Sequence, residues 1–187
     1  MQRLFASLNI PDGWLIWAAL IVLNLLALFV GQKASAGDVE LKCSAGYKRP
    51  MLALELNAGA APEMYKCWDE STKKSLRTAL LWDYLFIFIY SASISAAGFL
   101  VARYLDNQQF LAFEYSLIIF FLQLIAAVLD ATENVALLKV LRGPIASPWP
   151  QLARGCAILK FSLISVNLAY VLFGVGVWLY KTLLGNR

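Results

Sequence analysis

Four long apolar segments divide the chain, and none of them contains more than two charged residues. They cover residues 14–30, 79–101, 110–129 and 152–180. A hydrocarbon core of about 30 Å needs about 20 helical residues to cross it, which each segment approaches or exceeds. The strands of a membrane β-barrel would instead alternate apolar and polar residues over about ten positions. The pattern therefore predicts an all-α membrane protein, with one domain folded as a four-transmembrane-helix up-down bundle.

The connections between the apolar segments predict helices at about 14–30, 79–104, 110–141 and 152–182. The short polar turn at 106–109 makes the second and third helices antiparallel neighbours. Three prolines between residues 143 and 150 separate the third helix from the fourth, because each proline removes a backbone donor. The long first loop, residues 31–78, is expected to be ordered. Its apolar stretch 51–57 is expected to be the best ordered part and to cover the mouth of the bundle.

Composition excludes several classes of protein. The chain is 60% hydrophobic and 15% charged, with a mean hydropathy of +0.65, whereas soluble domains are about 45–50% apolar and about 25% charged. It has no histidine, which removes histidine-assisted nucleophiles and histidine-ligated metals. It also lacks the glycine-rich motifs that bind nucleotide phosphates. These absences argue against an enzyme, leave a membrane enzyme that uses carboxylates alone as an alternative, and predict no cofactor.

The net charge of +4 is modest for so apolar a chain. Lysine and arginine commonly sit at the ends of membrane helices, where they face lipid headgroups. We interpret the basic residues in this way and predict no nucleic-acid partner.

Ionisable residues inside the apolar segments are the candidate functional groups. Such residues are costly in a membrane, so they pair with one another or line a wet site. Helical periodicity and the predicted helix directions bring five ionisable residues and one amide to the long-loop end of the bundle: Asp83, Asp130, Glu133, Arg154 and Lys160, with Asn134. One interpretation is a binding site for an ion or a lipid headgroup, with the carboxylates as oxygen ligands and the cations holding a phosphate. The other is an ion-pair network that joins three helices.

Two cysteines in the long loop bear on membrane orientation. Cys43 and Cys67 predict a disulfide in an oxidising compartment, although both remaining as thiols is the alternative. Eight basic residues between positions 31 and 77 argue the other way, since the positive-inside rule would place that loop in the cytoplasm. We expect cytoplasmic termini and an external long loop, in a plasma or inner membrane.

No motif of a known family is recognisable in the sequence, so the functional prediction rests on the residues alone. The absence of catalytic residues favours a non-enzymatic accessory or structural subunit of a membrane complex. Its expected partners are membrane lipids and other membrane protein subunits. The alternative is a transport-type protein that binds an ion or a lipid headgroup at the charged cluster.

Overall fold

The computed structural model describes residues 13–35, 63, 66, 68–109, 114–143 and 148–184. Four long helices make up this part of the chain: α2 (Gly13–Ser35), α5 (Glu70–Asn107), α6 (Glu114–Val140) and α7 (Trp149–Leu184). Each is long and apolar enough to cross a membrane, and no strand occurs among the described residues. The prediction of an all-helical chain with four membrane-length helices is confirmed.

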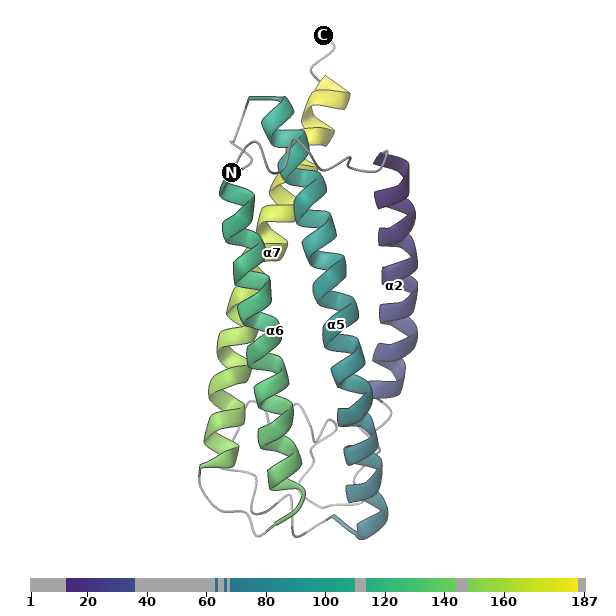
Figure 1. Cartoon of the computed structure of the whole chain (residues 1–187), viewed down its shortest axis with the longest axis vertical. Coiled ribbons are helices and arrows are strands. Elements are labelled where there is room, and N and C mark those ends of the chain that lie inside the picture. Colours follow the sequence, from purple (N-terminus) through teal and green to yellow (C-terminus); the bar gives the residue numbers. More distant parts are fainter. Residues whose placement is uncertain are drawn as a thin grey trace.

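The four helices lie side by side, and helices that follow one another in the sequence run in opposite directions (Figure 1). Helix α5 is central, since it packs against each of the other three. Helices α6 and α7 also pack closely against each other, whereas α2 lies at the edge and packs chiefly against α5. The core of the described part is therefore a three-helix unit, α5–α6–α7, with α2 attached to one side.

Helix α5 begins nine residues earlier than predicted, at Glu70 rather than at residue 79. The side chain of Asp69 caps the helix by accepting a hydrogen bond of 2.7 Å from the backbone N–H of Thr72. An aspartate at this position satisfies one of the unpaired backbone donors of the first turn. Its negative charge also interacts favourably with the positive end of the helix dipole. The prediction that residues 70–78 form a loop is wrong, because it relied on hydropathy and ignored this capping signal.

The other boundaries also differ from the predictions. Helix α2 continues past residue 30 to Ser35, and α7 begins at Trp149 and ends at Leu184. Polar side chains extend both helices beyond the apolar segments. At the end of α6, the Arg77 side chain donates a 3.0 Å hydrogen bond to the backbone oxygen of Leu141. The stretch 51–57 lies outside the described residues.

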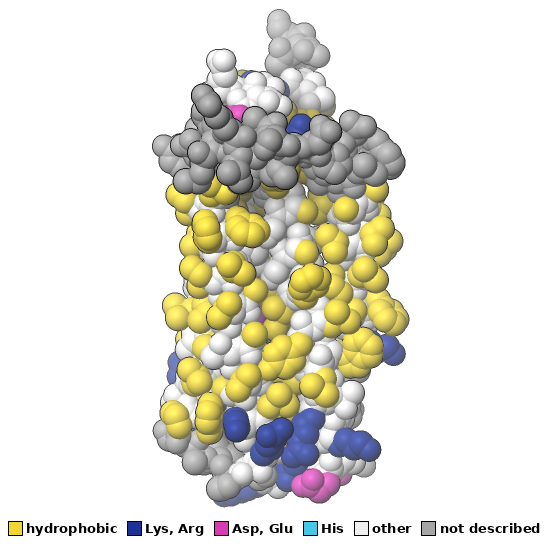
Figure 2. Space-filling view, in the orientation of Figure 1, with side chains coloured by type: hydrophobic (Ala, Val, Ile, Leu, Met, Phe, Trp, Pro, Cys, Tyr) yellow, Lys and Arg dark blue, Asp and Glu magenta, His cyan; other side chains and the backbone are white. Residues whose placement is uncertain are grey.

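Helices α5 and α7 are longer than a membrane is thick. Their 38 and 36 residues span about 57 and about 54 Å, compared with about 30 Å of hydrocarbon. Apolar side chains form a wide band around the molecule, and lysine and arginine gather at the end where α5 begins (Figure 2). The first turns of α5, with Lys73, Lys74 and Arg77, belong to this basic end.

Small residues let α5 and α7 approach closely at one point. A side chain at Gly174 of α7 would overlap with Val101 of α5. Gly98 of α5 makes a looser approach to α6, where an added Cβ would lie 3.6 Å from Ile119. Gly176, two residues beyond Gly174, has no atom within 4 Å of an added Cβ. Gly174 and Gly176 therefore lie in opposite environments.

Candidate functional site

A buried lysine bridges two carboxylates between α6 and α7. The Nζ atom of Lys160 lies 2.6 Å from Oδ1 of Asp130 and 2.7 Å from Oε2 of Glu133. The three residues are 6%, 4% and 0% exposed. Asp130 and Glu133 are three residues apart on α6, so they share a helix face that points at α7. One ammonium group therefore joins both carboxylates in the interior.

Helix α5 adds two hydrogen bonds to this network. The hydroxyl of Tyr90 donates to Oδ2 of Asp130 at 2.8 Å. The amide of Asn134, on α6, donates to Oδ2 of Asp83 at 2.7 Å. As a result, polar contacts connect all three helices of the core at the same level.

A second polar layer lies two helical turns away, seven residues before Asp130 on α6 and seven residues after Lys160 on α7. Asn167 donates to Oε1 of Gln123 at 2.7 Å, and Gln123 donates to the hydroxyl of Ser91 at 3.2 Å. Asn167 and Gln123 are 0% and 1% exposed. This layer is uncharged, and it again links α5, α6 and α7.

The structure brings five of the six predicted site residues together. Lys160 contacts Asp130 and Glu133, and Asn134, one residue after Glu133, contacts Asp83. Arg154 is the exception, because it is exposed on α7 and forms no ion pair with the cluster.

The cluster contains three carboxyl groups and one ammonium group. Pairing is essential for buried charges, because removing one partner of such a pair typically costs about 3–5 kcal/mol. Among the described residues, no three of His, Cys, Asp and Glu lie close enough together to hold a metal ion. What the arrangement supplies is a set of charged contacts between helices. Binding of an ion or a lipid headgroup there stays a prediction.

The predicted disulfide lies outside the described residues, since neither Cys43 nor Cys67 is among them. The cysteine that the structure describes is Cys156 of α7, a buried free thiol. The membrane orientation therefore stays a prediction from the sequence.

Helix α7 carries a surface feature that the sequence analysis missed. Small residues recur every seven positions, and all of them are exposed: Gly155, Ser162, Ala169 and Gly176. We call these four residues the outward heptad face. The residues two positions before each of them are all buried, and they form the inward heptad face: Ala153, Lys160, Asn167 and Gly174. Two residues correspond to about 200° around a helix, so the two faces are nearly opposite.

Large apolar side chains accompany the outward heptad face. Leu159, Val166 and Phe173, each four residues after a small residue, are 56%, 50% and 49% exposed. The hydroxyl of Ser162 donates to the backbone oxygen of Ile158 at 2.9 Å, so it is satisfied within its own helix. Alternating small and large residues at heptad spacing is the pattern that lets a neighbouring helix pack closely. The seven-residue recurrence was visible in the sequence.

A second missed feature connects α2 to α5. The side-chain amide of Asn24 donates to the hydroxyl of Ser93 at 3.0 Å and to the backbone oxygen of Leu20 at 2.8 Å. Asn24 is the single polar residue between positions 14 and 30. A lone amide in an apolar helix favours a hydrogen bond to another helix, which is the signal that would have identified it.

Comparisons with known proteins leave the family open. No protein-family model matches the chain. No curated protein and no solved structure matches it either. The four membrane-length helices are compatible with a multi-pass membrane protein, and its activity has to be inferred from its own residues.

Proposed function

We propose that this protein is a non-catalytic multi-pass membrane protein that serves as a structural or accessory subunit of a membrane complex. Its partner in this proposal is a transmembrane helix of another subunit. The outward heptad face of α7 is the docking surface.

The observation that carries the proposal is the exposure of small residues on a lipid-facing helix. Contact with lipid does not require small side chains, since lipid tails adapt to large ones. Helix–helix contact in a membrane does favour them, because Gly, Ala and Ser allow two backbones to approach. The outward heptad face continues over 22 residues, from Gly155 to Gly176, which is about 33 Å of helix and matches the hydrocarbon thickness.

The buried charged cluster supports the same proposal in a different way. Lys160 is already engaged by Asp130 and Glu133 at hydrogen-bond distance. In this proposal the cluster holds α5, α6 and α7 in a fixed arrangement. A rigid three-helix core then presents the outward face of α7 without the entropy cost of ordering it on association.

The proposed membrane arrangement is an up-down bundle with both ends of the helical unit on one side. Helix α2 begins and α7 ends at the same end of the molecule (Figure 1). We keep the sequence-based orientation, with this end cytoplasmic and the long loop outside. The basic end in Figure 2 is the opposite end, where α5 begins, and the positive-inside rule would assign that end to the cytoplasm. The two expectations conflict, and labelling of Cys43 and Cys67 from either side of the membrane decides between them.

The proposal is tested by gentle solubilisation, native mass spectrometry and a paired substitution. A variant with Ala169→Leu and Gly176→Leu fills the outward heptad face with bulky side chains. Ala19→Leu is the matched control, because Ala19 is also exposed and lies on α2, away from this face. We expect the wild-type chain and the control to retain the same partner and the paired variant to lose it.

Two results would contradict the proposal. One is a wild-type chain that is strictly monomeric with no co-purifying protein under gentle conditions. The other is a paired variant that retains the partner at the wild-type level. A second copy of this chain as the partner would still support the docking surface, and it would identify the complex as a homo-oligomer.

A second candidate function is binding of a cation by the buried cluster. It is favoured by the excess of carboxyl groups, since Asp130 and Glu133 share the ammonium of Lys160 and Asp83 is held by the amide of Asn134. Thermal unfolding in detergent with added sodium, potassium, magnesium or calcium tests it. Binding to the folded state would raise the melting temperature with cation concentration, and the same cation would have no effect on the Asp83→Asn variant. An unchanged melting temperature in every salt would remove this candidate.

A further inference from the structure

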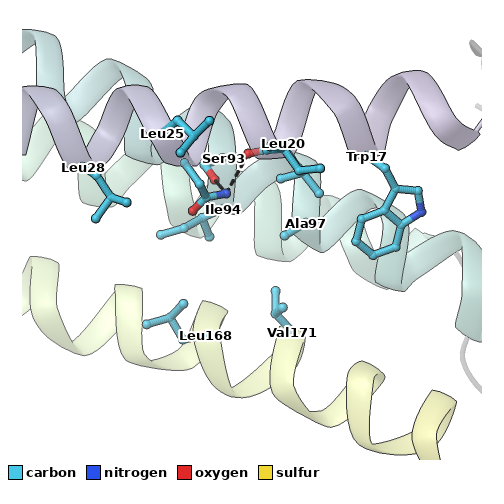
Figure 3. A pocket seen from close by; sticks show the side chains of 11 residues that line it. Trp17, Leu20, Leu25, Leu28, Ser93, Ile94, Ala97, Leu168 and Val171 are labelled. Atoms are coloured by element: carbon cyan, nitrogen blue, oxygen red, sulfur yellow. Dashed lines mark hydrogen bonds between the residues drawn. The ribbon is translucent and has the colours of Figure 1, made fainter.

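A groove on the side of the molecule lies between α2 and α7, and α5 forms its floor. Its volume is about 470 Å³. Leu168 and Val171 of α7 face Leu20 and Leu28 of α2 across the gap, and Ala97 of α5 lies beneath (Figure 3). The groove is separate from both the charged cluster and the outward heptad face. Helix α2 packs chiefly against α5, and α7 forms the opposite wall with Leu168 and Val171.

The lining of the groove is almost entirely apolar. The polar side chains in it are Asn24 and Ser93, which hydrogen-bond to each other at 3.0 Å. The groove therefore offers dispersion contacts and little opportunity for new hydrogen bonds. An occupant of matching chemistry is a hydrocarbon chain.

The length of the groove matches one leaflet of a bilayer. Its lining on α2 runs from Trp17 to Leu28, which is about 16 Å of helix. One leaflet contributes about half of a hydrocarbon core that is about 30 Å thick. An acyl chain lying along the helices would fill the groove from end to end.

A single hydrocarbon chain matches the groove better than a helix does, because a helix has a diameter of about 10 Å and the groove holds only about 470 Å³. An acyl chain is narrow enough to enter without separating α2 from α7.

A cation lies beyond one end of the groove. Tyr104 and Gln108 follow Ala97 at seven and eleven residues, so they continue the same face of α5 for about 16 Å. The ammonium of Lys181, on α7, donates to Oε1 of Gln108 at 2.6 Å. A phosphate near this ammonium would place the headgroup beyond Trp17, and the acyl chain would run toward Leu28.

We infer that the groove between α2, α5 and α7 binds one acyl chain of a membrane phospholipid. The lipid fills space that the protein's side chains leave open. It thereby joins α2 to the core of α5, α6 and α7. Its ester end lies near Trp17, and its terminal methyl lies near Leu28.

The inference is tested by photolabelling in vesicles of phosphatidylcholine. A small fraction of the lipid carries a diazirine, either close to the ester or close to the terminal methyl of one chain. Ile94 is the reporter, because it lies in the groove and is only partly exposed. Ile125 and Val128 of α6, which are 50% and 59% exposed, report ordinary contact with bulk lipid.

Ala97→Phe fills the groove, and Ala19→Phe places the same side chain on an exposed position of α2 that does not line it. We expect Ala97→Phe to lower labelling at Ile94 about tenfold, the change expected when about two methylene groups lose their contacts. Labelling at Ile125 stays constant in both variants. The ester-side probe should modify Trp17, and the methyl-side probe should modify Leu28.

Three outcomes would overturn the inference. The first is an absence of label at Ile94 in the wild-type chain. The second is equal labelling of Ile94 in Ala97→Phe and Ala19→Phe. The third is loss of label at Ile94 when a co-purified polypeptide is present in the vesicles, which would assign the groove to a protein partner. None of these outcomes depends on the outward heptad face, so the two proposals can fail separately.

Discussion

The two heptad faces of α7 have the same spacing and opposite environments. On the inward heptad face, Lys160 and Asn167 are buried and make polar contacts with α6. On the outward heptad face, Ser162 and Ala169 are exposed, and the Ser162 hydroxyl donates to its own helix. Helix α7 therefore points polar side chains into its own bundle and small side chains outward.

The difference teaches how a chain in lipid is held together. Apolar side chains gain little by leaving lipid for the interior, so packing and polar contacts have to supply the stability. The inward face supplies both, through the ion pairs of Lys160 and the close approach at Gly174. The outward face is exposed among the described residues and has a shape suited to close helix packing, which is why we assign it to another subunit.

The largest expected effect comes from removing the shared cation of the inward face. Lys160→Met leaves Asp130 and Glu133 buried together without a counter-charge. Breaking a buried pair in this way costs about 3–5 kcal/mol, and for a chain of this size a loss of about 10 °C in melting temperature is expected. Thermal unfolding in detergent, followed by circular dichroism, measures it.

Two further variants check the cause of that loss. Arg154→Met removes an exposed cation from the same helix, and its melting temperature should stay close to that of the wild-type chain. The triple variant Asp130→Asn, Glu133→Gln and Lys160→Met removes every charge of the ion pairs, and it should recover most of the lost stability. If the triple variant is as unstable as Lys160→Met, unpaired charge is not the reason for the loss.

The next effect distinguishes Gly174 from Gly176 on α7. Gly174→Ala places a methyl group against Val101, and overpacking of this kind typically costs about 1–3 kcal/mol. Gly176→Ala meets open space, so its fold should be as stable as the wild type or slightly more stable, because alanine favours helix. Adding Val101→Ala to Gly174→Ala should restore stability. Equal effects of the two glycine substitutions would contradict the assignment of the two faces.

The smallest effect concerns the edge helix. Asn24→Leu removes the hydrogen bond to Ser93, and such bonds in membranes are worth about 0.6 kcal/mol on average. We expect little change in melting temperature and faster proteolysis or exchange near α2. Ser93→Ala should act similarly, and the double variant should add nothing further. Additive losses would mean that the two side chains act independently.

The sequence was sufficient to predict the helices and most of the buried cluster. Asp83, Asp130, Glu133 and Lys160 stood out because charge is rare in apolar segments, and helical periodicity placed Asp130 and Asn134 on one face. The start of α5 could not be read from hydropathy, because its first turns are polar and depend on the cap at Asp69.

Other parts of the site needed the three-dimensional arrangement. Whether Arg154 joins Lys160 in the cluster depends on the rotation of α7, and a six-residue separation puts the two side chains on different faces. The groove depends on where α2 docks, and α2 packs mainly against α5 through an apolar surface whose pattern in the sequence does not specify the neighbouring helix. The outward heptad face was readable as a repeat, but its exposure follows only from the packing of α5 and α6 on the other side of α7.

A leucine scan along α7 tests the central claim most directly. Every residue from 155 to 176 is replaced in turn by leucine, or by alanine where leucine is native, and the co-purified partner is quantified alongside the melting temperature. The account predicts that partner loss peaks every seven residues, at Gly155, Ser162, Ala169 and Gly176, with melting temperatures unchanged at these positions. Melting temperature should fall instead at the inward positions Lys160, Asn167 and Gly174. Partner loss without a seven-residue period, or partner loss that only follows the melting temperature, would contradict the claim that the outward heptad face of α7 is a subunit interface.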